Sequence, residues 1–120
     1  MANILMVDDS KTSRKILRQL FEGAGHTIVG EESNGEEGFI KFRELKPDLV
    51  TMDITMPVMD GIEALQLMKR EDENAKVVMI TALGQKEKML KAIKCGASEF
   101  ITKPFEDADV LNVINKLLEA

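Results

Sequence analysis

The chain has 120 residues, 44% of them hydrophobic, and a formal net charge of −5, which indicates a folded domain and argues against direct binding to nucleic acid. No apolar run approaches the roughly 20 residues that a membrane helix needs, and the single cysteine, Cys95, excludes an intrachain disulfide. We therefore expect a cytoplasmic protein with no membrane segment, whose one domain fills residues 1–120.

Short apolar runs alternate with amphipathic segments along the chain. The first run, residues 4–7, has no polar member, as in a strand that is buried on both faces. The segments between the runs repeat apolar residues at helical spacing, as at Val110, Val113, Ile114 and Leu117. The predicted strands are 4–7, a second one that begins at 27–30, 49–53, 77–81 and 99–102, and the predicted helices are about 11–22, 36 to the proline at 47, 61–70, 85–95 and 107–118.

Five strands that alternate strictly with five helices predict an α/β fold. Parallel neighbours need crossover connections, so the pattern favours a doubly wound parallel sheet with helices on both faces. The face of the first helix that packs on this sheet is expected to consist of Ile16, Leu17, Leu20 and Phe21. His26, the only histidine, is expected to be a loop residue between this helix and the second strand.

Polar residues stand at the ends of four predicted strands. Asp8 and Asp9 follow the first strand and Asp53 ends the third. Thr81 ends the fourth strand and Lys103 follows the fifth. Ligands of an open parallel sheet bind at the carboxyl ends of the strands, so these side chains are expected to meet there. Each alone would be an ordinary cap, strand or surface residue, whereas the five together indicate a site.

Three carboxylates that lie close together repel one another, and a divalent cation removes that cost. Oxygen ligands with few of them from the protein favour Mg²⁺, which keeps several waters. The alternative is that Asp8 and Asp9 only cap the first helix. Beside Mg²⁺, Asp53 could act as a nucleophile toward phosphorus, as carboxylates do when they form aspartyl phosphates. Thr81 and Lys103 would then hold phosphoryl oxygens.

The order and spacing of these residues resemble those of response-regulator receiver domains, most of all the chemotaxis-type (CheY-like) single-domain regulators, over the whole chain. The matching motifs are Val7-Asp8-Asp9-Ser10, Asp53 with Met56-Pro57 and Asp60-Gly61, Thr81-Ala82, and Lys103-Pro104-Phe105. The resemblance implies a flavodoxin-like (βα)5 fold with strand order 2-1-3-4-5, a topology for which chemotaxis receivers are a standard example. It also implies a cis bond between Lys103 and Pro104.

The resemblance implies a two-component phosphorelay switch rather than an enzyme. Asp53 would accept a phosphoryl group from a histidine kinase, and Thr81 and Lys103 would contact that group. The ligands of Mg²⁺ would be Asp8, Asp9, Asp53 and the main-chain carbonyl of Thr55.

The resemblance also implies how the signal would leave the domain. Thr81 would couple to Phe100, a ring that can rotate inward but has no phenol hydroxyl to bond. A downstream target would bind the face formed by the fourth helix, the fifth strand and the fifth helix, with the flagellar motor switch as one candidate.

Two other functions use similar chemistry or topology. A phosphatase of the haloacid-dehalogenase type also has an aspartyl nucleophile and Mg²⁺, but it needs a second acid where this chain has Thr55. Flavin binding is disfavoured because the first loop is acidic and the chain has no Trp or Tyr. A stand-alone receiver in a phosphorelay outside chemotaxis remains open as an alternative.

Two side chains are expected to flank the path of water toward an aspartyl phosphate. Thr55 is two residues past Asp53, and Leu83 is two residues past Thr81. Thr55 is short and Leu83 has no polar group, so neither orients water well. We therefore expect slow autodephosphorylation and a separate phosphatase as a partner.

Overall fold

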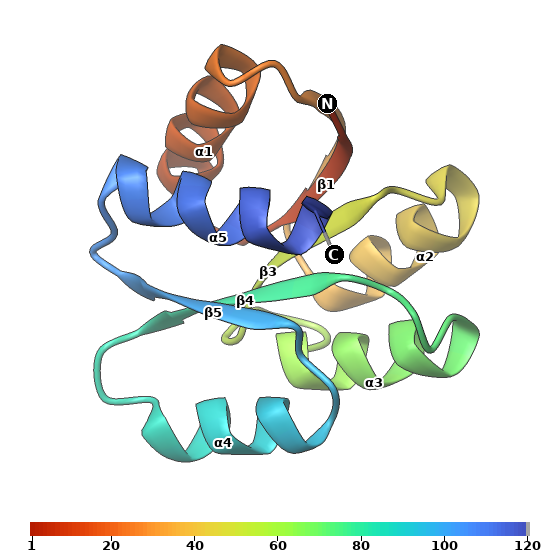
Figure 1. Cartoon of the computed structure of the whole chain (residues 1–120). Coiled ribbons are helices and arrows are strands. Elements are labelled where there is room, and N and C mark those ends of the chain that lie inside the picture. The colour runs from red at the N-terminus through yellow and green to blue at the C-terminus, as the bar shows by residue number, and fades with distance from the viewer. Residues whose placement is uncertain (120) are drawn as a thin grey trace.

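The structure is a computed structural model, and it describes residues 1–119. Five strands and five helices alternate along this part of the chain (Figure 1). The strands are β1 (Asn3–Val7), β2 (Thr27–Glu32), β3 (Leu49–Asp53), β4 (Val77–Ala82) and β5 (Glu99–Lys103), and the helices are α1 (Lys11–Gly23), α2 (Gly35–Leu45), α3 (Gly61–Glu71), α4 (Lys86–Lys94) and α5 (Asp107–Glu119). None of these helices is long and apolar enough to cross a membrane.

All five strands belong to one parallel sheet in the order β2-β1-β3-β4-β5, which confirms the predicted topology. Val7 pairs with Met52 at the ends of β1 and β3, and Ala82 pairs with Lys103 at the ends of β4 and β5. The carboxyl ends of β1, β3, β4 and β5 are therefore neighbours at one edge of the sheet, as a site built from strand ends requires.

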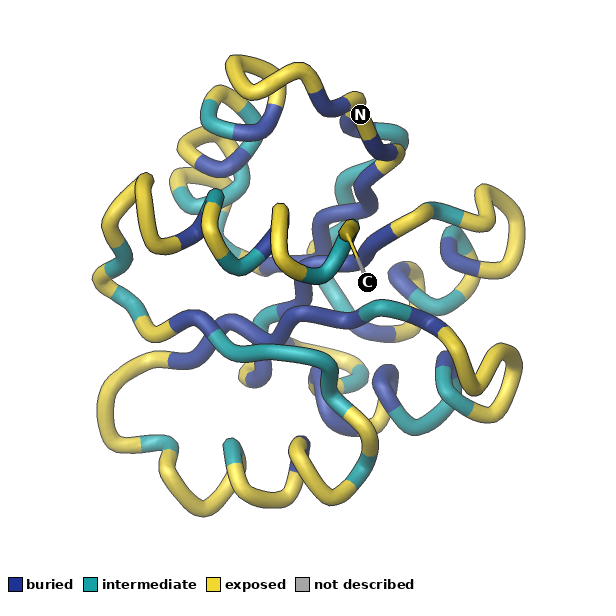
Figure 2. Tube along the Cα trace, viewed as in Figure 1, coloured by how far each residue is buried: buried dark blue, intermediate teal, exposed yellow. Residues whose placement is uncertain are grey.

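The sheet separates two apolar cores. One core lies under α1 and α5 and consists mainly of Ile4, Met6, Leu17, Phe21, Leu49, Val78, Ile80, Val110 and Ile114. The other lies under α2, α3 and α4 and includes Leu5, Val7, Phe42, Val50, Met52, Ile62, Leu65, Met68, Met79 and Ala92. In Figure 1, α1 and α5 lie above the sheet and α3 and α4 below it. Figure 2 shows the strands mostly buried and the outer faces of the helices exposed.

Three helices begin with a side-chain cap. Ser10 accepts the Ser13 N–H before α1, Asn34 accepts the Glu37 N–H before α2, and Asp60 accepts the Glu63 N–H before α3. A cap of this kind contributes about 1 kcal/mol to helix stability. The cap at Ser10 begins α1 directly after the two acids that follow β1.

The first helix corrects one sequence prediction. Leu17 and Phe21 are buried, but the Ile16 residue is 45% exposed. Consecutive residues of a helix point about 100° apart, so the stripe that faces the sheet through Leu17 and Phe21 leaves Ile16 at its rim. Leu20, one turn from Ile16 on the same side but closer to the stripe, is half-buried and packs against the core.

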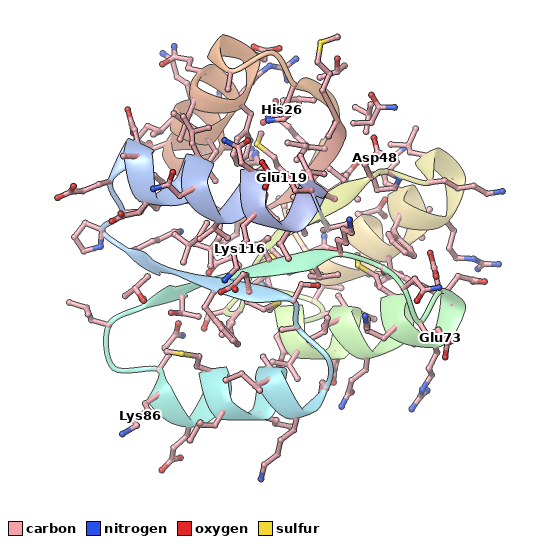
Figure 3. The ribbon with its side chains drawn as sticks, viewed as in Figure 1. His26, Asp48, Glu73, Lys86, Lys116 and Glu119 are labelled. Carbon is pink, nitrogen blue, oxygen red and sulfur yellow. The ribbon has the colours of Figure 1, made fainter. Side chains whose placement is uncertain are left out.

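His26 lies in the loop between α1 and β2, as predicted, but it is buried rather than solvated. Its Nδ1 accepts the main-chain N–H of Ala2 at 3.1 Å, just before β1. Figure 3 labels His26 near the start of the chain. Burial and the positive charge of the chain's N-terminus lower the pKa of His26, so the neutral imidazole is the form that accepts this bond.

Candidate functional site

Three acids meet at the ends of β1 and β3. One carboxylate oxygen from each of Asp8, Asp9 and Asp53 lies within 4.8 Å of the other two. The two strands are direct neighbours in the sheet, which explains why acids 45 positions apart in the sequence converge. The predicted meeting of these three side chains is therefore present in the structure.

Asp8 is the most buried member of the cluster, with 1% of the residue exposed. Its Oδ1 accepts the main-chain N–H of Ser10 at 2.8 Å, and its Oδ2 accepts from Nζ of Lys103 at 3.1 Å. Nη1 of Arg14 donates to the main-chain carbonyl of Asp8 at 2.5 Å, while Nε of Arg14 pairs with Glu31 at 3.3 Å. Asp8 is thus held on both its side chain and its backbone.

Asp53 is half-buried at the end of β3. Its Oδ1 accepts the main-chain N–H of Ile54 at 2.9 Å, and its Oδ2 lies 3.9 Å from Nζ of Lys103. Burial, and next the negative charge of Asp8, raise the pKa of Asp53 to about 6, although Lys103 opposes the shift. Because ionising this carboxylate costs more free energy than ionising an exposed one, a positive charge placed beside it stabilises it more.

Thr81 ends the buried part of β4, next to the strand that carries Asp53. Its residue is 1% exposed, and its Oγ1 has no hydrogen-bond partner within residues 1–119. Most buried hydroxyls in proteins are paired, and one that is not calls for an explanation such as a missing ligand. The unpaired hydroxyl lies one strand away from Asp53.

Phe100 shares a sheet face with Thr81, because Met79 pairs with Phe100 and Thr81 pairs with Thr102 in the same register. The ring is half-buried and packs against the core under α3 and α4. Thr81 and Phe100, which the family resemblance couples, are therefore diagonal neighbours on one face.

Lys103 ends β5 at the sheet edge and reaches back over the site to Asp8 and Asp53. Its peptide bond to Pro104 is cis, as the family resemblance implied. Lys103 is the only basic side chain within residues 1–119 that an ion pair links to these acids. One ammonium against three carboxylates leaves the cluster with excess negative charge if all three are ionised.

Thr55 lies in the exposed loop between β3 and α3. Its Oγ1 accepts from Nε2 of Gln85 at 2.6 Å, and Oε1 of the same carboxamide accepts the main-chain N–H of Ala82 at 2.9 Å. Farther along the loop, Val58 has a φ of 68°, and the Met59 N–H donates to the Pro57 carbonyl at 2.7 Å. The backbone strain of a β-branched residue in this region is of the kind that concentrates at functional loops.

The acid cluster fits a hard divalent cation. Its donors are all oxygens, it carries excess negative charge, and its geometry is open on the exposed side at Asp9. Few protein ligands with room for water suit Mg²⁺ better than Ca²⁺, which takes six to eight oxygens. Asp8, Asp9 and Asp53 could therefore hold Mg²⁺.

A family model described as the response regulator receiver domain matches residues 4–115. The chain belongs to this family. The receiver domain is 45% identical over 114 residues to the chemotaxis protein CheY of Thermotoga maritima, covering 95% of each chain. It is also 45% identical over 115 residues to CheY of Bacillus subtilis, covering 96% of each.

Solved structures agree with this relationship. The crystal structure of the CheX-CheY-BeF3-Mg+2 complex from Borrelia burgdorferi contains a chain that superposes on this receiver domain with a TM-score of 0.92. The two are 41% identical, and the match covers 97% of this chain and 88% of that one. The receiver domain therefore has CheY-like chemotaxis proteins as homologues over almost all of its length.

Two side chains at the site were not predicted from the sequence. Arg14 holds the backbone of Asp8, and Gln85 bridges the loops after β3 and β4. Arg14 lies one helical turn past the cap residue Ser10, a position from which a long basic side chain can reach back to the strand end. Gln85 lies in a loop without periodicity, so no pattern in the sequence singles it out.

Proposed function

We propose that this receiver domain, acting as one unit over residues 1–120, is a phosphorylation-controlled switch in a two-component phosphorelay. Asp53 accepts a phosphoryl group from a histidine kinase. The observation that carries the proposal is the setting of Asp53: a half-buried carboxylate faces the ammonium of Lys103, with the unpaired hydroxyl of Thr81 on the next strand. These are the charges and donors that a phosphoryl group needs.

The transfer is a displacement at phosphorus. A carboxylate oxygen of Asp53 attacks, an O–P bond forms, and the bond from phosphorus to the donor atom breaks with its electron pair leaving on the donor. With a phosphohistidine donor the leaving atom is an imidazole nitrogen, which then takes a proton from water. The pKa of Asp53 is about 6, so the carboxylate is mostly ionised at neutral pH and able to attack.

Lys103 and Thr81 act on the oxygens of the transferred group. The Lys103 ammonium already lies between Asp8 and Asp53, where it can neutralise a phosphoryl oxygen. The Thr81 hydroxyl can donate to another. Asp8, Asp9, Asp53 and the carbonyl of Thr55 would hold Mg²⁺, which neutralises charge on the phosphoryl group. We propose no side chain of this site as a catalyst of repeated turnover. The domain is therefore a switch that dephosphorylates itself slowly, rather than an enzyme.

The output surface is proposed to be the face of α4, β5 and α5. Leu90 and Ile93 of α4 are 50% and 49% exposed, and their spacing puts them on the same side of the helix. Lys86, labelled at the start of α4 in Figure 3, points away from the molecule. Phe100 of β5 borders this face, so inward rotation of its ring when Thr81 binds a phosphoryl oxygen would change the surface.

A role in chemotaxis is supported by the identity to CheY proteins. On this basis we propose a cytoplasmic regulator whose downstream target is the flagellar motor switch or a similar assembly, with a separate phosphatase that ends the signal. Capture of binding proteins from the native cell by the beryllofluoride-treated domain distinguishes this from the alternative, a receiver in another phosphorelay.

The proposed site is tested by chemical phosphorylation. Acetyl phosphate and Mg²⁺ should add one phosphoryl group to the wild type and none to Asp53→Asn, as measured by intact-protein mass spectrometry. The matched control is Asp109→Asn, which removes an exposed acid of α5 and should label like the wild type. Equal labelling of Asp53→Asn and the wild type would overturn the assignment.

A further inference from the structure

The carboxamide of Gln85 joins three parts of the molecule at the mouth of the site. Its Nε2 donates to Oγ1 of Thr55, in the loop after β3, at 2.6 Å. Its Oε1 accepts the main-chain N–H of Ala82, the last residue of β4, at 2.9 Å. Gln85 itself directly precedes α4. The two ends of this carboxamide are thus bonded to the loop after β3 and to the end of β4.

The N–H of Ala82 points toward the space beyond the end of β3. The carbonyl of Ile80 faces β3, because it accepts the N–H of Ile54. Groups on a strand alternate in direction with a period of two residues, so Ala82 presents its N–H on the same side as Ile80. β3 ends at Asp53, and the N–H therefore has no strand partner on that side. Gln85 supplies its acceptor.

A phosphoryl group on Asp53 would bring oxygens into the same space. The Thr81 hydroxyl is the adjacent donor and has no partner in the described chain. An oxygen that reaches this hydroxyl lies next to the N–H of Ala82, and an oxyanion is a stronger acceptor than a neutral carboxamide. One N–H serves one good acceptor, so the phosphoryl oxygen and Gln85 compete for it.

We propose that Gln85 is a positioning residue of the phosphorylation site, a latch that occupies the Ala82 N–H and ties it to Thr55 until a phosphoryl oxygen displaces it. This inference rests on the proposed function of Asp53. The latch holds the two loops in one arrangement in the unmodified domain. Its release frees the residue that precedes α4, so the exchange of acceptors is transmitted to the helix that carries Leu90 and Ile93.

Beryllofluoride with Mg²⁺ is the probe, because it presents a phosphoryl-like group to Asp53 reversibly. Its dissociation constant is measured by isothermal titration calorimetry at fixed Mg²⁺. Gln85→Ala removes the competing acceptor and should bind about two- to tenfold more tightly, the factor that corresponds to one net hydrogen bond. Gln85→Glu keeps an acceptor and adds a negative charge, so it should bind more weakly than the wild type.

The control is Gln19→Ala, the same chemical change on the exposed side of α1, which should leave the affinity unchanged. A second measurement reads the contact without any ligand. Loss of the carboxamide should move the amide proton resonance of Ala82 upfield in Gln85→Ala and leave it in place in Gln19→Ala.

Equal or weaker binding of beryllofluoride by Gln85→Ala would overturn the latch, as would an Ala82 resonance that does not move. Both results leave the proposed function standing if the wild type binds beryllofluoride and Asp53→Asn does not. Failure of the wild type to bind would instead overturn the proposed function, and the latch with it.

Discussion

Lys103 and Asp8 form an ion pair, at 3.1 Å, between residues that are 95 positions apart in the chain. The carboxylate is almost fully buried, whereas the lysine side chain is one quarter exposed. The pair joins the end of the edge strand β5 to the end of β1 across β3 and β4. It therefore ties the first and the last of the four strands that form the site.

Replacing Lys103 with methionine should destabilise the domain most when Mg²⁺ is absent. The variant leaves the buried carboxylate of Asp8 without its cation, at a cost of roughly 1–3 kcal/mol in the free energy of unfolding. Saturating Mg²⁺ should shrink this loss, because the ion neutralises the same acids. Urea unfolding with EDTA and with Mg²⁺ measures both values. Lys88→Met, which replaces an exposed lysine of α4, should change the free energy of unfolding little. A loss of stability in Lys103→Met that is the same in EDTA and in Mg²⁺ would contradict the prediction.

Asp53 should make stability fall as the pH rises through a defined window. Its pKa is about 6 in the folded domain and 3.8 ordinarily, so between these values the folded state keeps a proton that the unfolded chain has lost. Folding is then favoured less at higher pH. In EDTA, Asp53→Asn should be more stable than the wild type at pH 7, with a smaller difference near pH 4. Equal stabilities of Asp53→Asn and the wild type at pH 7 would show that the charge of Asp53 does not destabilise the folded domain.

His26 should act in the opposite direction. Its pKa is lowered in the folded state, so the unfolded chain binds the proton more readily below its ordinary value of 6.5. Stability is fully present above that pH and is lost as the pH falls through the folded pKa. In His26→Gln, whose side chain can still accept the Ala2 N–H, stability should fall less as the pH is lowered. Denaturant unfolding between pH 5 and 8 tests it, and an unchanged slope in the variant would exclude His26 as the cause.

Gly61 should not tolerate a side chain. A Cβ at this position would lie 2.0 Å from the main-chain oxygen of Asp53, so the backbone at Asp53 must move. Gly61→Ala should cost about 1–3 kcal/mol or more and reduce labelling by acetyl phosphate. Gly23→Ala is the matched control, because a Cβ there has no neighbour within 4 Å. Similar melting temperatures for the two variants would refute the close approach.

The lifetime of the phosphorylated form should depend on the polarity of two side chains at the mouth. Leu83 is 76% exposed, and the Thr55 hydroxyl is bonded to Gln85 rather than directed at water. Leu83→Glu and Thr55→Asn each add a group that can orient water, and even weak orientation should speed hydrolysis, since a full general base contributes about 10²–10⁴-fold. Phosphate release from purified phosphoprotein measures this. Unchanged release from both variants would mean that water access there does not limit the lifetime.

Much of the fold could be predicted from local pattern. Buried parallel strands appear in the sequence as unbroken apolar runs, and their ends gave the positions of Asp8, Asp53 and Thr81. The bounds shifted by a residue or two where the pattern is weakest: α4 spans Lys86–Lys94 rather than 85–95. Ile16 was misplaced because helical spacing gives the direction of the apolar stripe but not its width.

Contacts of residues outside the strand-end motifs could not be predicted in the same way. The burial of His26 depends on the backbone of Ala2, which no periodicity reveals. Gln85 was missed for a related reason, because its partners Thr55 and Ala82 meet only once β3 and β4 are side by side. The sequence motifs pointed to the residues that meet at the strand ends, but not to the residues that position them.

Because four different strands contribute to the site, a partly folded chain cannot form it. A partly folded chain in which β5 has not joined the sheet lacks Lys103 beside Asp8, and one without β4 lacks the Thr81 hydroxyl. Every pairing involved is between strands that a helix separates in the sequence, so the site is complete only when β1, β3, β4 and β5 have all joined the sheet. The phosphorylation proposed for Asp53 would then take place only in fully folded molecules, and a partly folded copy would not transmit the signal.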